Sequence, residues 1–418
     1  MDRLLVTNIG VLTTPAGTAA KRGAAQGEVR TLRDAWVMIE DGVIASVGTG
    51  QPEAAPGARV LDAGGRLATP GLVDAHTHLI FGGWRQDELA LKLKGVPYLD
   101  ILAQGGGILS TVRATRAASQ EELADKARLA LDEMLAFGTT TCEAKSGYGL
   151  DTETELRQLR AIRALNKSHP IDLVPTFLGA HALPEVYKED RAAYIRLLCE
   201  EMIPAVAAEK LADFCDVFCE TGVFTAEESR TILEAGKKYG LRPKLHADEI
   251  DPIGGSRLAG EIGAVSAEHL IVCPQDGIAS MARGGTTACL LPATSFYLGT
   301  AYAPARAMVD AGVPVALATD FNPGSCPCLN MQLVMSLGCL KYRLTPEEVL
   351  TAVTLNGAAA IGLADRTGSA EPGKWGDLVL WEAGDLNYIT YRLGSNLVHT
   401  VIKRGIPYQG GNKNVQAS

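Results

Sequence analysis

Residues 72–80 read LVDAHTHLI, a short apolar run that ends in two histidines one residue apart. A glycine pair follows at positions 82–83, as expected where a strand gives way to a loop. Alternate residues of a strand point to the same face, so the side chains of His76 and His78 would project together. The stretch therefore predicts a buried strand that carries two imidazoles at its carboxyl end.

Seven further apolar runs of similar length follow, with helical patterns between them. The helical stretches include EELADKARLALDEMLAFG and AAYIRLLCEEMIPAVAAEKL, in which apolar residues recur at helical spacing. Eight short runs alternating with helices over roughly 300 residues predict an α/β fold, a (β/α)8 TIM-type barrel. The seven runs are TTTCEAK (139–145), IDLVPTFLG (171–179), FCDVFCE (214–220), RPKLHAD (242–248), AVSAEHL (264–270), TACLLPA (287–293) and VPVALATD (313–320).

Both ends of the chain contain short β-branched runs that are cut by Gly, Asp and Pro. They read LLVTNIGVL, AWVMIEDGVIASVG and RVLDAGGRLATPG near the N-terminus, and GDLVLWE and HTVIKRGIPY near the C-terminus. The pair Asp41-Gly42 indicates a tight hairpin turn. We therefore expect a small β-sandwich-like domain built from residues 1–65 and 366–418, with the barrel formed by residues 66–365.

The bulk composition excludes several classes of protein. The chain has 418 residues, is 47% hydrophobic and carries a formal net charge of −9 without any basic run, so it offers no electrostatic footprint for nucleic acid or an anionic membrane. No stretch resembles a signal peptide or a membrane span, so we expect a cytoplasmic protein. The nine cysteines are expected to be reduced and structural, because the single close pair, Cys326 and Cys328, is a weak metal-site pattern.

Unusual polar residues fall at the predicted carboxyl ends of the strands, where the chemistry of such a barrel gathers. Five of the seven histidines lie there, and so do two acidic residues after the fifth strand and one at the end of the eighth. A lone histidine at such a place is at least as often an ordinary hydrogen-bonded side chain, but the joint placement favours a functional cluster. The residues are His76, His78, His181, His246, His269, Asp248, Glu249 and Asp320.

Three imidazoles and one carboxylate at a barrel mouth form a suitable ligand set for one Zn²⁺, or for another borderline divalent ion such as Fe²⁺. We predict that the metal ligands are His76, His78, His246 and Asp320. A second metal ion would need bridging ligands, and the fourth run contains no lysine that could be carbamylated into one. Lys145 lies on the second run instead, so a single metal ion is favoured.

These residues also carry a family resemblance. The D-x-H-x-H that ends the first strand, the later strand-borne histidine and the aspartate of the last strand resemble the amidohydrolase superfamily. The longer stretches FGGWRQDEL, GGGILSTVRATR, EAKSGYGL, TFLGAHALP, HADE and TDFNPG are similar to one family within it, the imidazolonepropionases. The similarity runs from the N-terminal β segment to TLNGAAAIGL at 354–363. AEHL at 267–270 departs from it, because Asp-His is expected there.

The resemblance implies the reaction. It would be metal-dependent hydrolysis of the ring C–N amide bond of 4-imidazolone-5-propanoate to N-formimidoyl-L-glutamate, the third step of histidine degradation to glutamate. It also implies one Zn or Fe ion per subunit, a cytoplasmic setting and a homodimer, with a small-molecule substrate and neither nucleic acid nor membrane as a partner.

Such a hydrolysis needs an activated water, an acceptor for the proton of that water, and a donor to the leaving nitrogen. A metal-coordinated water has a pKa of about 7. Asp320 can accept the proton and pass it to the nitrogen, while His269 can orient the water or stabilise the developing oxyanion, and either residue could be the first acceptor. His181 and Glu249 can reach the ring nitrogens or the carbonyl oxygen, and a carboxylate that faces ring N–H groups would select an imidazolone.

The carboxylate tail of the substrate needs a cation. Arg85, in the loop after the first strand, is the natural clamp because a guanidinium grips a carboxylate through two parallel hydrogen bonds, although a loop arginine taken alone is usually just solvated. Tyr148 can donate through its phenol or simply pack. Asn322, Gly324 and Ser325 follow Asp320 and could hold the ring or the product. The role of Lys145 stays open between adding positive charge near the tail and pairing with Glu143.

Three other readings compete. Another cyclic amidohydrolase, or a purine or pyrimidine aminohydrolase of the same fold, would not require an arginine for a carboxylate, so FGGWR argues against them. A barrel that has lost its metal and serves as a scaffold is disfavoured because all four candidate ligands are present. The glycines at 105–107 lack the Gly-Lys-Ser/Thr of a phosphate-binding loop and are better interpreted as a turn at the barrel mouth.

Overall fold

All eight predicted core runs contain a strand of one parallel sheet in the computed structural model, which describes residues 2–52, 55–96 and 105–409. The strands of the first and last runs are shorter than predicted: they end at Asp74 and Leu317, so His76, His78 and Asp320 lie in the segments that follow them. Neighbours in the sheet are neighbours in the sequence, as the (β/α)8 prediction requires. The strands are β6 (Leu72–Asp74), β7 (Thr139–Lys145), β8 (Asp172–Ala180), β9 (Phe214–Cys219), β10 (Arg242–Ala247), β11 (Ser266–His269), β12 (Thr287–Leu290) and β13 (Val315–Leu317).

The barrel closes through the residues that follow its first and last strands. Thr77 forms a parallel bridge with Phe321, and the N–H of Asp320 donates to the carbonyl of His76 over 3.1 Å. Beneath this bridge the carboxylate of Asp74 accepts from both the backbone N–H of Thr319 (3.0 Å) and its hydroxyl (2.6 Å). The closure places His76 and His78, which follow β6, directly beside Asp320, which follows β13.

We expect replacement of Asp74 by alanine to lower the free energy of unfolding by about 1–3 kcal/mol. The reason is that the fully buried N–H and hydroxyl of Thr319 would lose their acceptors. A urea titration measures the change, and Thr319→Ser, which keeps the hydroxyl, is the matched control. An unchanged midpoint in Asp74→Ala would show that the closure does not depend on this carboxylate.

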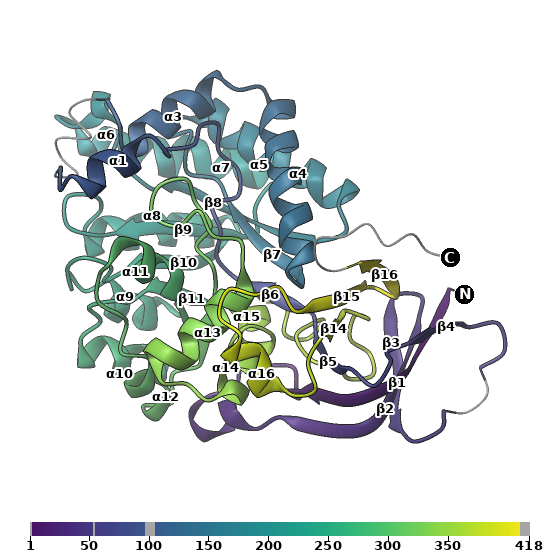
Figure 1. Cartoon of the computed structure of the whole chain (residues 1–418). Helices are drawn as coiled ribbons and strands as arrows, with labels where there is room; N and C mark the ends of the chain where they lie inside the picture. The colour runs from purple at the N-terminus through teal and green to yellow at the C-terminus, as the bar shows by residue number, and fades with distance from the viewer. Residues whose placement is uncertain (1, 53–54, 97–104, 410–418) are drawn as a thin grey trace.

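Helices follow the strands and cover the outside of the barrel (Figure 1). The predicted amphipathic stretch before β7 is the single helix α4, which begins with a capping box between Ser119 and Glu122. The predicted stretch before β9 is interrupted instead, because Pro204 has no N–H to continue the α-helical pattern and a π-helical turn precedes it at Leu198–Met202. The helices are α1 (Glu88–Leu93), α3 (Ile108–Ala117), α4 (Gln120–Ala136), α5 (Thr152–Ser168), α6 (Arg191–Leu197), α7 (Ile203–Ala208), α8 (Ala226–Lys238), α9 (Gly255–Ile262), α10 (Gln275–Gly284), α11 (Pro292–Leu298), α12 (Ala305–Asp310), α13 (Met331–Tyr342), α14 (Pro346–Ala352), α15 (Leu355–Ala360) and α16 (Leu386–Tyr391).

The chain ends form a second sheet, which Figure 1 shows beside the barrel with purple and yellow strands together. Its order is β16-β15-β14-β5-β1-β2-β3, with β4 paired to β1. Asp41 and Gly42 both have positive φ, so the predicted hairpin turn between β2 and β3 is confirmed. The division at residues 65 and 366 stays a prediction. The strands are β1 (Arg3–Thr14), β2 (Arg30–Glu40), β3 (Val43–Thr49), β4 (Arg59–Asp62), β5 (Leu67–Pro70), β14 (Leu378–Trp381), β15 (Val398–Lys403) and β16 (Ile406–Gln409).

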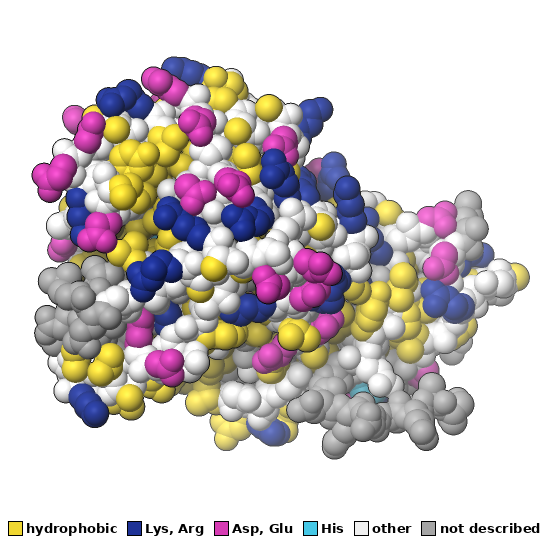
Figure 2. Space-filling view, turned by 90° about the horizontal axis from the view of Figure 1, so that it is seen from above, with side chains coloured by type: hydrophobic (Ala, Val, Ile, Leu, Met, Phe, Trp, Pro, Cys, Tyr) yellow, Lys and Arg dark blue, Asp and Glu magenta, His cyan; other side chains and the backbone are white. Residues whose placement is uncertain are grey.

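The surface matches the composition. Over the face drawn in Figure 2, acidic and basic side chains are interspersed, and histidine is almost absent. Within the described part of the chain, no helix is both long and apolar enough to cross a bilayer. This face therefore presents no single-sign patch of the kind that nucleic acid would need.

Candidate active site

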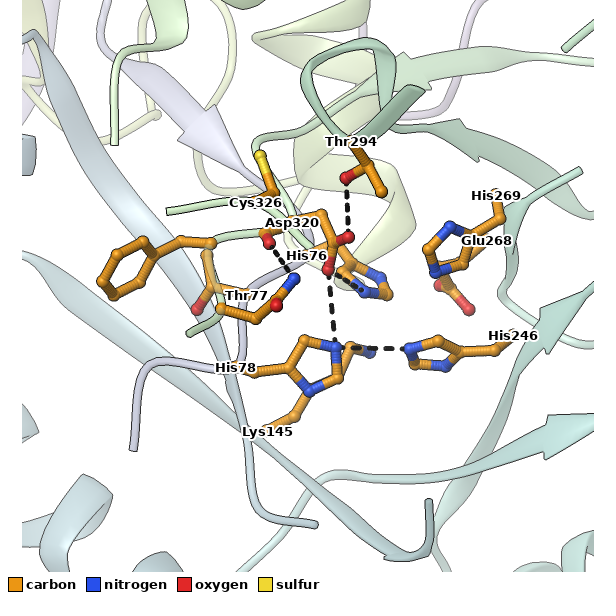
Figure 3. A network of polar contacts seen from close by, with 12 residues as sticks. His76, Thr77, His78, Lys145, His246, Glu268, His269, Thr294, Asp320 and Cys326 are labelled. Carbon is orange, nitrogen blue, oxygen red and sulfur yellow. Dashed lines mark hydrogen bonds and ion pairs between the residues drawn. The ribbon is translucent and has the colours of Figure 1, made fainter. Parts of the chain in front are cut away.

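The predicted metal ligands converge at the carboxyl end of the barrel, although they come from three segments that are far apart in the sequence (Figure 3). His78 Nε2 lies 3.4 Å from His246 Nε2. Asp320 Oδ1 lies 3.5 Å from the Nε2 atoms of both His76 and His78. All four side chains are buried. The pairing of the segments that follow β6 and β13 brings His76 and His78 beside Asp320, and His246 reaches the same place from the end of β10.

The donor set fits one divalent metal ion. Metal–nitrogen bonds of about 2.0–2.1 Å in a tetrahedral site put ligand atoms about 3.3–3.4 Å apart, close to the separations seen here. Both ring nitrogens of His76 and Oδ1 of Asp320 are buried without a hydrogen-bond partner among the described residues. Unpaired buried polar atoms are costly, and a cation between them would satisfy them.

The histidines are in the protonation state that a metal ligand needs. Burial, and then the charge of Lys145, holds the pKa of His76 well below its usual range. Burial likewise holds the pKa of His78 well below that range, and it lowers the pKa of His246 to about 3. Neutral imidazoles offer a lone pair at neutral pH, so little proton release is required before a metal ion binds.

Asp320 is held in an unusual backbone conformation. Its φ of 58° lies in the left-handed region, where a non-glycine residue is strained. Its Oδ2 accepts a 2.6 Å hydrogen bond from the hydroxyl of Thr294, at the start of α11, which leaves Oδ1 toward the histidines. Burial raises the pKa of Asp320 to about 6. Sequence reasoning missed Thr294, and nothing in its local pattern distinguishes it from other threonines.

His269 and Glu249 form the opposite side of the site. His269 Nε2 lies 3.7 Å from Glu249 Oε2, and the ring of His269 is 5.7 Å from that of His76 between centroids. The Glu249 side chain is 16% exposed, so it borders the mouth. Burial, and then the nearby Glu220 carboxylate, raises the pKa of Glu249 to about 7. Both predicted residues thus lie beside the donor set, with Glu249 able to change its charge near neutral pH.

His181 and Tyr148 line the site next to the metal donors. The ring of His181 stacks on that of His78 with 4.8 Å between centroids, and Tyr148 lies 5.2 Å from His181. His181 Nδ1 is 3.0 Å from the carbonyl of Gly147 and must donate to it, so the proton is assigned to Nδ1. Burial lowers the pKa of His181 to about 4. The Nε2 atom of this neutral ring is left as an acceptor.

Arg85 is fixed by its neighbours. Its Nε and Nη2 donate to the two oxygens of Glu88 over 3.0 and 2.9 Å, and the side chains of the pair are only 9% and 8% exposed. Glu88 also accepts from the N–H of Gly107, in the predicted glycine turn, over 2.6 Å. The guanidinium packs against Gly324, where an added Cβ would overlap Nη1. Arg85 is therefore seated on the loop that follows Asp320.

The glycine pair after β6 packs closely against a neighbouring helix. A Cβ on Gly82 would overlap the backbone of Ala114, and a Cβ on Gly83 would press on the side chain of the same residue. Both glycines therefore permit close packing of the loop on α3. The loop that presents Arg85 is held in place rather than loose.

If Arg85 binds the carboxylate of the substrate, as the sequence predicts, Gly324→Ala should weaken that binding, because the new Cβ would displace the guanidinium of Arg85. Gly324 is not among the residues with positive φ, so alanine fits the backbone and only the side-chain space is lost. The KM should rise roughly tenfold while the folding midpoint stays close to wild type. Gly384→Ala is the control, since nothing lies within 4 Å of its Cβ position. An unchanged KM would contradict the idea that packing against Gly324 positions the guanidinium of Arg85 for the substrate.

Asn322 and Ser325 organise the loop itself. Asn322 Oδ1 accepts from the N–H groups of Gly324 (2.8 Å) and Ser325 (2.7 Å), and its Nδ2 donates to the carbonyl of Asp320 over 2.7 Å. These local bonds make an Asx-type turn that links the metal donor to the seat of Arg85. Their predicted contacts with substrate stay predictions.

Two features of the sequence receive a structural answer. Of the two roles left open for Lys145, the structure shows the pairing with Glu143: its fully buried ammonium lies 2.8 Å from both Glu143 and Asp216. Cysteine contributes to none of the potential metal-donor groups found among the described residues, and the buried thiol of Cys326 donates to the carbonyl of Thr319. Sequence reasoning missed Asp216, although an acidic residue inside the apolar run FCDVFCE is a signal that could have singled it out.

Comparison with known proteins shows to which family the chain belongs. Residues 67–407 match the amidohydrolase family, so the chain belongs to that family. Solved structures agree on the fold alone: guanine deaminase from E. coli is 16% identical with a TM-score of 0.75, covering 99% of this chain and 100% of its own. An adenosine deaminase from Xanthomonas campestris with bound zinc is 21% identical with a TM-score of 0.72, covering 99% and 94%.

Curated relatives narrow the class. The imidazolonepropionase of Alkaliphilus metalliredigens is 53% identical over 97% of each chain. Those of Bacillus cytotoxicus (98% of each chain) and Streptococcus sanguinis (92% of each chain) are both 52% identical. Within the amidohydrolases, the chain belongs to the imidazolonepropionase family, and the resemblance inferred from its motifs is confirmed.

Proposed function

We propose that the protein hydrolyses the ring C–N amide bond of 4-imidazolone-5-propanoate to N-formimidoyl-L-glutamate, a step in the degradation of histidine to glutamate. The observation that carries this function is the full-length relationship to imidazolonepropionases, joined to a buried three-histidine and aspartate cluster at the barrel mouth. The test is a metal-dependent assay with imidazolone propanoate beside guanine, cytosine and dihydroorotate. Turnover of one of the latter three, and none of the first, would overturn the assignment.

The proposed metal ligands are His76, His78, His246 and Asp320, and the proposed ion is Zn²⁺ or Fe²⁺, one per subunit. Both ions accept imidazole and carboxylate ligands in this arrangement. When bound, such an ion lowers the pKa of a coordinated water to about 7 and polarises a carbonyl group. The resemblance also supports a homodimer and a cytoplasmic location, which we carry as proposals.

Residues of the chain itself would accept the proton of the attacking water and transfer it to the leaving nitrogen. Oδ1 of Asp320 faces the histidines as a proposed metal ligand, so the carboxylate would lie beside a coordinated water and would accept its proton. Because Thr294 holds the other oxygen, the protonated carboxyl keeps its orientation and can pass the proton to the leaving nitrogen. His269 lies beside this route, where it orients the water and stabilises the developing oxyanion.

Different side chains hold the imidazolone ring and the carboxylate tail of the proposed substrate. Nε2 of His181 and the carboxylate of Glu249 face the site as acceptors for ring N–H groups. Arg85, aligned by Glu88, takes the tail carboxylate, and Tyr148 donates through its phenol. This division demands both a polar ring and a carboxylate from the substrate, whereas a purine or pyrimidine offers only the ring.

Arg85→Ala is expected to raise the KM about 10- to 100-fold with a smaller fall in kcat, because a bidentate charge-assisted contact to the substrate is lost. Steady-state kinetics with imidazolone propanoate measure the change. Arg128→Ala, which removes an exposed guanidinium that contacts Ser168, should leave both constants unchanged. If Arg85→Ala behaved like this control, the carboxylate clamp would be wrong.

The pH dependence of kcat/KM should reflect the protonation of the Glu249 carboxyl. Its pKa of about 7 means that the carboxyl is protonated below that pH and no longer accepts a ring N–H, so kcat/KM should fall as the pH drops through 7. Glu249→Gln should lower kcat/KM about 10- to 100-fold and abolish this limb. Glu261→Gln, on the exposed side of α9, is the control. A limb that persists in Glu249→Gln would assign the titration to another group.

A further inference from the structure

Five fully buried charged side chains form a network in the barrel, next to the metal donors but unused by the mechanism. Lys145 pairs with Glu143 and Asp216 at 2.8 Å each. Lys244 pairs with Glu143 at 2.7 Å and with Glu268 at 3.3 Å. Figure 3 shows Lys145 and Glu268, at two places in this network, beside the histidines. Buried charges survive only when paired, so a network of this size requires a reason for being there.

Asp216 joins this network to the metal donors. Its Oδ2 lies 3.0 Å from Nδ1 of His246 and 2.8 Å from the ammonium of Lys145. Its Oδ1 accepts from the backbone N–H of His246 over 3.2 Å. One carboxylate therefore contacts both the ring and the backbone of the same metal donor, while the lysine fixes its position.

This contact sets the tautomer of the ring. A carboxylate 3.0 Å from Nδ1 favours the proton on that atom, which leaves the lone pair of Nε2 on the side of His78. Nδ1 of His246, like Nδ1 of His76 and of His78, makes no hydrogen bond of standard geometry among the described residues, but it lies within ion-pair distance of a buried carboxylate, 3.0 Å from Asp216. His246 is thus the donor whose orientation and basicity the protein controls most directly.

We propose that Asp216, held in place by Lys145, is the positioning residue of the metal centre, acting through His246. The inference rests on the proposed metal ligands and not on the identity of the substrate.

The same residues are not a second metal site, although Asp216, His246 and Glu268 offer donor atoms within 4.8 Å of one another. Both carboxylates already have an ammonium partner, Lys145 for Asp216 and Lys244 for Glu268. A divalent ion there would face two buried positive charges. The lysines thus supply, as fixed cations, the counter-charge that a second metal ion would bring.

The first experiment measures metal affinity by titrating Zn²⁺ into the chelator-treated full chain. Asp216→Asn and Lys145→Met should raise the metal dissociation constant about 10- to 100-fold. Lys244→Met is the matched control, because Lys244 is equally buried and also pairs with Glu143, but its other partner is Glu268 rather than Asp216. Its affinity for Zn²⁺ should stay within a few-fold of wild type.

The second experiment takes its result from the wild-type chain and uses a variant only to assign the signals. Nitrogen-15 NMR of the metal-free wild-type chain should show the ring of His246 protonated at Nδ1 and bare at Nε2, with its signals assigned through their loss in His246→Gln. A proton on Nε2 would overturn the inference. So would unchanged affinity in both Asp216→Asn and Lys145→Met, or an equal loss in Lys244→Met. If the wild-type chain bound no Zn²⁺ or Fe²⁺, the metal centre would fail and this inference with it, whatever the substrate.

Discussion

His246→Ala is expected to lose the metal ion and the hydrolase activity together. Its Nε2 lies 3.4 Å from that of His78, within the shared donor cluster, and its Nδ1 contacts Asp216. Alanine would remove one of the four proposed metal ligands and leave the buried carboxylate of Asp216 without its imidazole partner. Metal content by elemental analysis should fall below about a tenth of an equivalent, and turnover should disappear.

The matched control is His399→Ala, because His399 lies on β15 in the terminal sheet with a side chain that is 39% exposed. That variant should keep both its metal ion and its activity. Near wild-type activity in His246→Ala would show that the metal centre lies elsewhere. Activity lost with full metal content would instead make His246 a residue of the reaction and not a ligand.

Asp320→Asn should have the second largest effect. The amide keeps the size of the side chain and can still accept from the hydroxyl of Thr294, but it cannot accept a proton at neutral pH. Because the proposed reaction routes two proton transfers through this carboxylate, kcat should fall about 10²- to 10⁴-fold. The KM should change little, since the proposed contacts to ring and tail come from other residues.

Rapid-quench or steady-state assays at saturating substrate, with metal content measured on the same sample, separate lost chemistry from lost metal. Asp310→Asn, an exposed aspartate at the end of α12, is the control. If Asp320→Asn kept more than a tenth of the wild-type kcat with its metal bound, His269 would become the candidate for the first proton acceptor. Thr294→Val should produce a milder loss in the same direction, because it frees the carboxylate to rotate.

Much of the fold follows from local patterns. Each core strand is a short apolar run bounded by polar or glycine residues, and burial on both faces of a parallel barrel strand leaves that signature in the sequence. The amphipathic helix before β7 was predicted from another local pattern, apolar residues that recur at helical spacing. The helix before β9 was predicted as continuous and is not, because the effect of Pro204 depends on how the flanking turns pack.

Some residues of the candidate site could likewise be predicted from the sequence, and others could not. The histidines were placed together by a rule of topology, since the carboxyl ends of parallel strands meet at one mouth. Asp216 could not be assigned, because its partner His246 lies on the next strand and the contact depends on the register of β9 against β10. Thr294 and Glu88 were missed for a similar reason: their partners are set by loops whose course no short pattern encodes.

The sequence by itself determined the eight-stranded barrel, the strand-end histidines and the family, because periodicity, burial and motif are properties of neighbouring residues. Only the tertiary structure decided which side chains touch. It paired Lys145 with Glu143 and Asp216, and it packed Arg85 against Gly324. The physical reason is that such contacts form between segments distant in the chain, where strand register, barrel closure and the space left by a missing Cβ select one partner among many.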